Sequence, residues 1–131
     1  MDIIEIRTRA TEEFVDLTAE VGRVVTGSGV ASGICVVTVP HTTAGVTVNE
    51  NADPDVRADL LMTLRRIVPD ALPYAHAEGN SPAHVKASLV GSSVTLVIES
   101  GRLKLGTWQG VFFCEFDGPR TRNVWIQIIG K

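Results

Sequence analysis

The chain contains one unbroken apolar run, Gly33-Ile34-Cys35-Val36-Val37-Thr38-Val39, which ends at Pro40. β-Branched residues are frequent in this run, and their stiff side chains favour strands over helices. We therefore expect a β-strand that is covered on both faces. A second strand is expected at residues 44–48, where valines alternate with Thr47.

Further strands are expected on either side of this pair. Apolar alternation or short apolar runs predict them at residues 2–8, 93–98, 111–116 and 124–129. A glycine-punctuated connection precedes the strand at 111–116. We find no internal repeat, no low-complexity tract and no linker.

Three helices are expected between the strands. In the first, Thr11 is the N-cap and Gly27 or Gly29 ends the helix. Each of the other two begins with a capping residue followed by proline, which fits the first turn of a helix. Their ranges are Asp53-Pro54 to Pro69 and Ser81-Pro82 to Leu89.

The resulting order, β-α-β-β-α-α-β-β-β, indicates an α+β fold. We expect a single domain over residues 1–131, with a largely antiparallel sheet packed against helices. A chain of 131 residues is long enough to bury a core. Its composition, 44% hydrophobic and 21% charged, excludes a chain that is mainly disordered.

Charge and hydropathy exclude several classes of function. The formal net charge is −3 and there is no basic stripe, which argues against nucleic-acid binding. No apolar run approaches the roughly 18 residues that a membrane span needs. The N-terminus lacks the cationic start and apolar core of a signal peptide, so we expect a cytoplasmic protein. Cys35 and Cys114 lie in apolar runs and are expected to be buried, reduced thiols.

Three stretches hold more polar side chains than turns require. They are residues 41–53, 74–84 and 101–120. All the histidines, His41, His76 and His84, fall in the first two stretches. His84 is expected in the first turn of its helix, where the helix dipole favours the neutral imidazole that binds metals or donates a hydrogen bond.

The two proline-marked helix starts can also bind anions, because their backbone N–H groups are unpaired. A pocket between them, with histidine and asparagine side chains nearby, would suit a phosphorylated small molecule. Glu50, Asp53 and Glu115 could add oxygen ligands for Mg²⁺.

Several of these residues also have purely structural interpretations. Asp53 fits an N-cap whether or not it serves a site. Arg57 lies within the apolar arc of its helix, which either snorkelling or a ligand contact explains. Trp108 fits the core or a platform that stacks on a planar ring. Arg120 and Arg122 fit the exposed side of a hairpin turn or a phosphate contact.

A run of motifs covers nearly the whole chain. The motifs are His41-Thr42-Thr43-Ala44, Asn49-Glu50-Asn51-Ala52-Asp53-Pro54-Asp55, Tyr74-x-His76-x-Glu78-Gly79-Asn80, Ala83-His84-Val85-Lys86-Ala87-Ser88-Leu89, Ser93-x₂-Leu96-x-Ile98-x₂-Gly101-x₄-Gly106-Thr107-Trp108-Gln109-x-Val111 and Phe113-Cys114-Glu115-Phe116-Asp117-Gly118-Pro119-Arg120. In these motifs the chain resembles the YjbQ-like family, and no motif position departs from the family's pattern.

The resemblance implies a compact α+β subunit that forms a homotrimer. It also implies a weak, secondary thiamine-phosphate synthase activity, which joins hydroxymethylpyrimidine pyrophosphate to thiazole phosphate and releases pyrophosphate. Carried over to matching positions, the expected site residues are His41, Asn49, Glu50, Asp53, His76, Asn80, His84, Trp108 and Glu115. In a trimer, residues that are distant in one chain can meet across an interface.

For this reaction we expect the leaving pyrophosphate to be stabilised by Lys86, by the helix start at Ser81-Pro82 and by Mg²⁺ on Glu50 or Asp53. Trp108 or Tyr74 would provide the flat wall that a pyrimidine ring needs.

Two other functions remain open. In a metal-dependent hydrolase, His41, His76 and His84 would hold a divalent metal such as Zn²⁺, with Glu50 or Glu115 as the base. The spacing His76-x₇-His84 matches no standard zinc pattern, however. The second alternative is a non-catalytic module that binds a phosphorylated metabolite.

Overall fold

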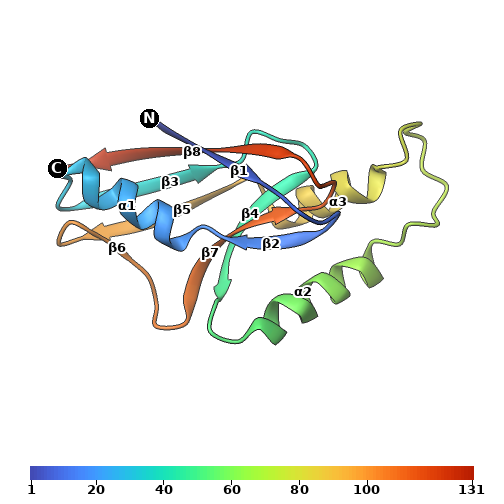
Figure 1. Cartoon of the computed structure of the whole chain (residues 1–131), viewed down its shortest axis with the longest axis horizontal. Helices are drawn as coiled ribbons and strands as arrows, with labels where there is room; N and C mark the ends of the chain where they lie inside the picture. Colours follow the sequence, from blue (N-terminus) through green and yellow to red (C-terminus); the bar gives the residue numbers. More distant parts are fainter.

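The computed structural model describes residues 1–131 and contains two antiparallel β-sheets and three helices (Figure 1). The five-stranded sheet has the order β1-β8-β3-β5-β6, and the three-stranded sheet has the order β2-β7-β4. The strands are β1 (Asp2–Arg7), β2 (Glu13–Asp16), β3 (Gly33–Thr38), β4 (Ala44–Glu50), β5 (Ser93–Glu99), β6 (Arg102–Lys104), β7 (Gln109–Glu115) and β8 (Thr121–Gly130). Every pairing is antiparallel, which confirms the predicted α+β fold.

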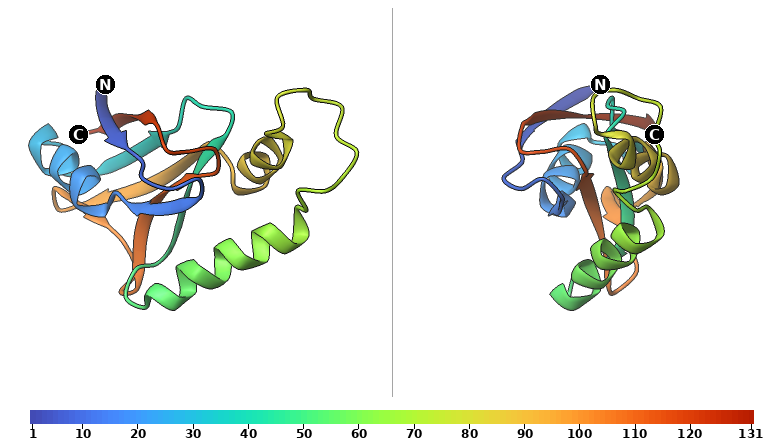
Figure 2. Two further views of the ribbon diagram at one scale, coloured as in Figure 1. Left: turned by 45° about the vertical axis from the view of Figure 1, so that its right-hand side comes forward. Right: turned by 90° about the vertical axis from the view of Figure 1, so that its right-hand side faces the viewer.

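The apolar run at residues 33–38 forms β3, in the middle of the five-stranded sheet between β8 and β5. Cys35 and Val37 are fully buried on its inner face, whereas Ile34 on the outer face exposes 38% of its surface. The expectation that this strand is covered on both faces is therefore wrong for the single chain described by the structure. The physical reason is that α1 (Thr18–Ser28) covers only the inner face of this sheet (Figure 2).

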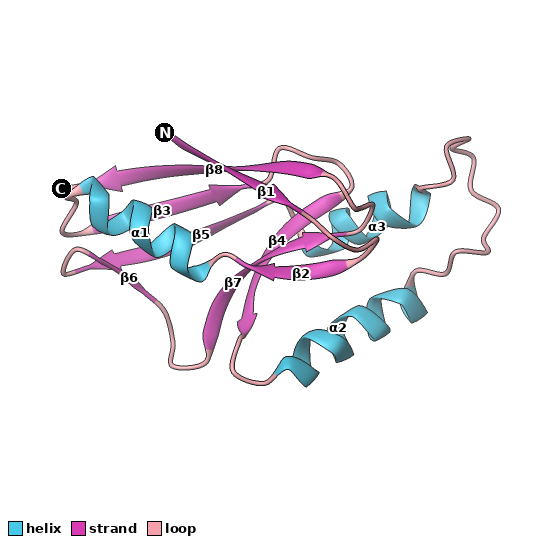
Figure 3. Ribbon diagram, viewed as in Figure 1, coloured by secondary structure: helices cyan, strands magenta, loops and turns pink.

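The main core lies between α1 and the two sheets (Figure 3). Val21 and Val25 of α1 pack there with Val37, Val111 and Val124 of three strands, and all five side chains are inaccessible to solvent. Burial of such apolar side chains is the main favourable contribution to folding.

Both cysteines are buried and free, as the sequence predicted. Burial raises the pKa of Cys35 to about 11 and also raises the pKa of Cys114. Because the thiolate is the reactive form, neither thiol is a nucleophile near neutral pH.

The first helix begins later than the sequence predicted. Thr11 is not its N-cap, because residues 13–16 form the strand β2, which pairs with β7. The ring of Phe14 lies 6.2 Å from that of Phe112 on the partner strand. Asp16 Oδ1 then accepts hydrogen bonds from the N–H and the hydroxyl of Thr18, at 2.9 and 2.6 Å, where α1 begins. Strand pairing and aromatic packing thus outweigh the local helical periodicity.

Helix α2 (Pro54–Ile67) begins and ends as predicted. Asp53 is its N-cap, and Asp53 Oδ1 accepts a hydrogen bond of 2.9 Å from the Asp55 N–H. The guanidinium of Arg57 lies 5.3 Å from the centre of the Phe112 ring, so a cation–π contact explains its position in the apolar arc. No residue of α2 is fully buried, and the helix lies along the outside of the molecule (Figure 2).

Helix α3 (Ser81–Val90) begins one residue earlier than predicted, with Asn80 rather than Ser81 as its N-cap. The Asn80 side chain makes no capping bond and is directed to Asp117 instead. The helix lies against β4, and its Ala83 and Ala87 pack with Cys114 in a small second core. None of the three helices combines the length and apolar character that crossing a membrane requires.

Candidate functional site

A polar hollow of about 670 Å³ lies between the loop after β3, the start of α3 and the turn from β7 to β8. We call it the histidine hollow, because all three histidines of the chain line it. The charged and amide side chains in its wall are Glu78, Asn80, Asp117, Arg120 and Arg122. Residues from three separate stretches of the sequence therefore meet in one place.

His76 and His84 form an edge-to-face pair in this wall. Their ring centroids are 5.4 Å apart and the ring planes are almost perpendicular, at 89°. His76 Nε2 is also 3.8 Å from a carboxylate oxygen of Glu78. The loop after α2 supplies His76 and helix α3 supplies His84, so the pair depends on how these two segments pack.

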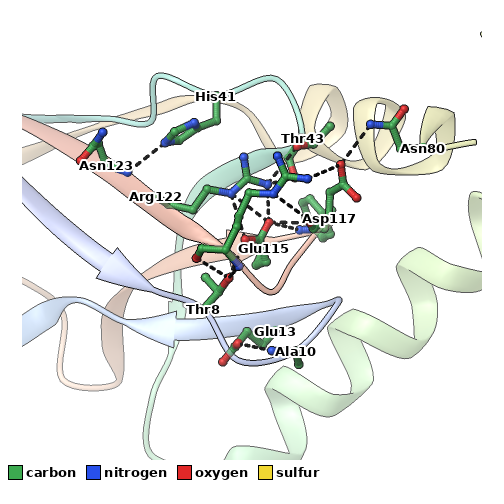
Figure 4. A network of polar contacts seen from close by, with 12 residues as sticks. Thr8, Ala10, Glu13, His41, Thr43, Asn80, Glu115, Asp117, Arg122 and Asn123 are labelled. Atoms are coloured by element: carbon green, nitrogen blue, oxygen red, sulfur yellow. Dashed lines mark hydrogen bonds and ion pairs between the residues drawn. The ribbon is translucent and has the colours of Figure 1, made fainter. Parts of the chain in front are cut away.

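His41 is held in one tautomer. Its Nε2 accepts a hydrogen bond of 2.9 Å from the backbone N–H of Asn123 (Figure 4). Since an accepting nitrogen carries no proton, the neutral ring is protonated at Nδ1. Burial and then the nearby positive charge of Arg122 lower the pKa of His41, which favours this neutral form.

A buried ion pair supports the floor of the histidine hollow. Arg122 Nε donates to Glu115 Oε1 at 2.9 Å, and Arg122 Nη2 donates to Thr43 Oγ1 at 2.9 Å. Glu115 also accepts a bond of 2.8 Å from the Thr8 hydroxyl and bonds of 3.1 Å from the N–H groups of Phe116 and Asp117 (Figure 4).

These contacts determine the ionisation and role of Glu115. Burial raises its pKa, but hydrogen bonds from Arg122, Thr8 and the Asp117 N–H outweigh burial and hold the pKa below its usual value. The side chain is fully buried and does not line the histidine hollow. The expectation that Glu115 acts as a base or metal ligand is therefore not met, because its oxygens are already occupied by protein donors.

Asp117 and Asn80 connect α3 to the turn after β7. Asn80 Nδ2 donates to Asp117 Oδ2 at 3.0 Å, and Arg120 Nη2 donates to the same oxygen at 3.2 Å. Sequence reasoning assigned no site role to Asp117 and left Arg120 and Arg122 between a hairpin turn and a phosphate contact. The two arginines do line the hollow, and the available signal was Arg120 directly after Gly118-Pro119, with Arg122 two residues further on.

Four other expected site residues lie elsewhere: Asn49, Glu50, Asp53 and Trp108. In the β4–β7 ladder, Ala44 pairs with Glu115 near the histidine hollow, whereas Glu50 pairs with Gln109 at the opposite end. None of the four lines a cavity in the structure. The expectation that they converge on the histidines is wrong within one chain, because the full length of β4 separates the two groups.

Two further expectations need correction. Trp108 is 63% exposed, so it is neither a core residue nor a wall of the histidine hollow. Lys86 is buried and does not line the hollow, because its side chain leaves α3 on another face from His84 and pairs with Glu12 at 2.7 Å.

The structure contains no group of three or more His, Cys, Asp or Glu side chains arranged to hold a metal ion. His41 cannot bind a metal through Nε2 while that atom accepts from Asn123. The arrangement of side chains therefore gives no support to a site built from all three histidines.

Comparison with known sequences supports the family resemblance. The family model described as UPF0047 protein YjbQ-like matches residues 2–131. A UPF0047 protein of Methanocaldococcus jannaschii is 51% identical over 126 residues, which cover 96% of this chain and 91% of that protein. The UPF0047 protein YugU of Bacillus subtilis is 48% identical over 128 residues, which cover 97% of both.

Solved structures show the same fold. A YjbQ/UPF0047 family protein from Clostridium acetobutylicum is 53% identical and superposes with a TM-score of 0.96, covering 98% of this chain and all 100% of that one. A YbjQ-like protein of unknown function from Sulfolobus solfataricus is 32% identical, with a TM-score of 0.95 and coverage of 99% and 96%. The chain therefore belongs to the UPF0047 family of YjbQ-like proteins.

Proposed function

We propose that the histidine hollow binds a phosphorylated small molecule and that the chain has the thiamine-phosphate synthase activity implied by its family resemblance. In this reaction the methylene carbon of the pyrimidine substrate loses its bond to pyrophosphate and gains a bond to the thiazole nitrogen. The observation that carries the proposal is the meeting of three histidines and two arginines in one hollow. Such groups can stabilise the negative charge that develops on a leaving pyrophosphate.

The charge of the hollow depends on its histidines. Its lining holds two positive groups, Arg120 and Arg122, and two negative groups, Glu78 and Asp117, so these four charges cancel. Glu115, which pairs with Arg122 just outside the lining, adds a third negative charge, so protonation of a single histidine would give a neutral hollow.

The three imidazoles would have two different roles. His41, neutral and protonated at Nδ1, can donate a hydrogen bond and orient a ligand without adding charge. The adjacent rings of His76 and His84 can hold a proton close to a leaving phosphate oxygen, which is the role of a general acid. Since two substrates must also be aligned, positioning alone would give a low, measurable rate.

Replacement of His76 or His84 by alanine tests this proposal. Removing a general acid should lower turnover of hydroxymethylpyrimidine pyrophosphate and thiazole phosphate by about 10²–10⁴-fold. Each variant should keep the circular dichroism spectrum of the parent protein. Arg23→Ala, on the exposed surface of α1, serves as the matched control and should leave turnover unchanged. Full activity in both histidine variants would contradict the proposal.

Metal analysis of protein purified without chelators separates this proposal from a metal-dependent hydrolase. Stoichiometric zinc that is lost in the His76→Ala and His84→Ala variants would favour the hydrolase. Tight binding of a phosphorylated metabolite with no turnover of any candidate pair would favour a binding module instead.

We also propose that the chain assembles as a homotrimer through the outer face of its five-stranded sheet. Cross-strand neighbours there are exposed apolar side chains: Ile34 pairs with Val97 and Ile129, and Ile3 pairs with Trp125. A contiguous apolar patch of this kind is typical of an interaction surface. Sedimentation analysis should give a trimer for the parent protein and for a Thr26→Asp control, and a smaller species for Val97→Asp. A monomeric parent protein would contradict the assembly.

A further inference from the structure

A second polar cavity, of about 180 Å³, borders the same Asn80–Asp117 pair as the histidine hollow. Asn80 and Asp117 line both spaces, so they form a shared wall. The small cavity is also lined by Lys86 and by the apolar side chains of Phe116 and Pro82. A water molecule takes up about 30 Å³ in the liquid, so this cavity has room for more than a single solvent molecule.

Lys86 brings a buried ammonium group to this cavity. The residue is only 3% exposed, which is rare for lysine. Its Nζ donates one hydrogen bond, of 2.7 Å, to Glu12, whose other oxygen accepts a bond of 2.8 Å from Arg65. An ammonium group has three N–H donors. Lys86 therefore has donors left for an acceptor inside the cavity.

Asn80 brings an acceptor without a partner. Its Nδ2 donates to the Asp117 carboxylate, which can only accept, so the orientation of the amide is determined. This leaves Asn80 Oδ1 as the one buried side-chain nitrogen or oxygen atom of the protein that has no hydrogen bond. An unpaired buried acceptor is unfavourable, so a ligand N–H that reaches it gains affinity.

The charges around the cavity disfavour an anionic ligand. Three carboxylates, those of Glu12, Asp70 and Asp117, line it together with the single ammonium of Lys86. A neutral group that both donates and accepts hydrogen bonds fits this lining better than a phosphate does.

We propose that this cavity binds a nitrogen heterocycle that carries an amino group next to a ring nitrogen. The amino N–H donates to Asn80 Oδ1, the ring nitrogen accepts from Lys86, and the ring packs against Phe116 and Pro82. This inference deepens the proposed function and rests on it in one respect, because a pyrimidine is one of the two proposed substrates. The shared wall would place such a ring beside a phosphate held in the histidine hollow.

Calorimetric titration of the intact protein with 4-aminopyrimidine and with unsubstituted pyrimidine tests the inference. The first probe should bind at least about tenfold more tightly, because pyrimidine leaves Asn80 Oδ1 unpaired. Equal affinity for the two probes, or no binding of either because the cavity holds only water, would overturn the inference.

Variants locate the bound ring. Asn80→Ala should abolish the preference for 4-aminopyrimidine, and the Glu12→Gln, Lys86→Met double variant, which removes both partners of the buried pair, should weaken binding of both probes about tenfold. Arg65→Ala alters the same ion-pair network outside the cavity and should change binding less than about twofold. A preference that survives Asn80→Ala would also overturn the inference.

The probes carry no phosphate, so this test is separate from the test of the proposed function. His84→Ala should weaken binding of inorganic pyrophosphate and leave binding of 4-aminopyrimidine unchanged. If His84→Ala keeps full pyrophosphate binding and turnover while the parent protein prefers 4-aminopyrimidine, the phosphate site alone is refuted. If the parent protein binds the two rings equally while His84→Ala loses pyrophosphate binding and turnover, this cavity alone is refuted.

Discussion

Both ends of β4 carry polar motif residues, yet the structure builds only one of them into a hollow. We call the end of β4 that begins at Ala44 the histidine end, because the histidine hollow lies there. The floor of this hollow is the buried Glu115–Arg122 pair, whose hydrogen bonds join residues up to 107 positions apart in the sequence. At the tryptophan end (Asn49, Glu50, Asp53 and Trp108), the side-chain hydrogen bonds are local. Asn49 Oδ1 accepts from the Glu50 N–H at 2.7 Å and Asp53 Oδ1 accepts from the Asp55 N–H at 2.9 Å.

The difference shows what turns a polar cluster into a pre-organised site. Buried, long-range hydrogen bonds hold side chains in one geometry, whereas local bonds to neighbouring N–H groups shape a turn and leave the surface open. In the trimer that we propose, groups of a neighbouring chain could complete the tryptophan end.

Among the substitutions that test this comparison, Glu115→Gln at the histidine end should lower the free energy of unfolding most. The substitution leaves Arg122 as a buried charge without its counter-ion, which costs about 3–5 kcal/mol of unfolding free energy. Urea denaturation followed by circular dichroism measures the change. Glu50→Gln, an acidic residue at the tryptophan end, is the matched control and should change stability by less than about 0.5 kcal/mol. Equal effects of the two substitutions would contradict the comparison.

Asp53→Ala should have an intermediate effect at the tryptophan end. Removal of an N-cap side chain costs about 1 kcal/mol, because the Asp55 N–H loses its acceptor. Asp55→Ala removes a charge from the same turn but keeps the cap, and should cost less. An Asp53→Ala variant as stable as the parent would show that the cap does not hold α2 in place.

The sequence predicts the local features of this molecule better than the long-range ones. Proline-marked helix starts and alternating strands depend on near neighbours, so α2 and the strand at residues 44–48 were expected correctly. The strand at 13–16 was missed because its pairing partner, β7, lies about 100 residues further along the chain. No local pattern encodes such a contact.

The same limit applies to the candidate site. The histidines could be singled out because such side chains are rare and fall in two polar stretches of the sequence. The distance between them and Trp108 could not be foreseen, because it depends on the β4–β7 register. The role of Glu115 also depends on a distant partner, Thr8, which carries no recognisable motif.

Trp108→Ala should have a small effect on the stability of one chain. Its side chain is largely exposed, so truncation removes little buried apolar area and should change the free energy of unfolding by less than about 0.5 kcal/mol. Phe112→Ala, in the following strand, removes a fully buried ring and should cost about 3–5 kcal/mol. A large cost at Trp108 that depends on protein concentration would instead place the tryptophan end in an interface between chains.

His41→Gln should change how stability responds to pH, because all the histidines lie at the histidine end. Folding lowers the pKa of His41 from its usual 6.5, so on acidification the unfolded chain takes up a proton before the folded protein does. Stability is therefore lost as the pH falls from about 6.5 to the lowered folded value, and is constant for this group below it. Glutamine keeps an acceptor for the Asn123 N–H but does not titrate, so denaturant midpoints measured between pH 7 and pH 5 should fall less in the variant. Parallel curves for the two proteins would show that His41 takes up its proton equally well in the folded and unfolded states.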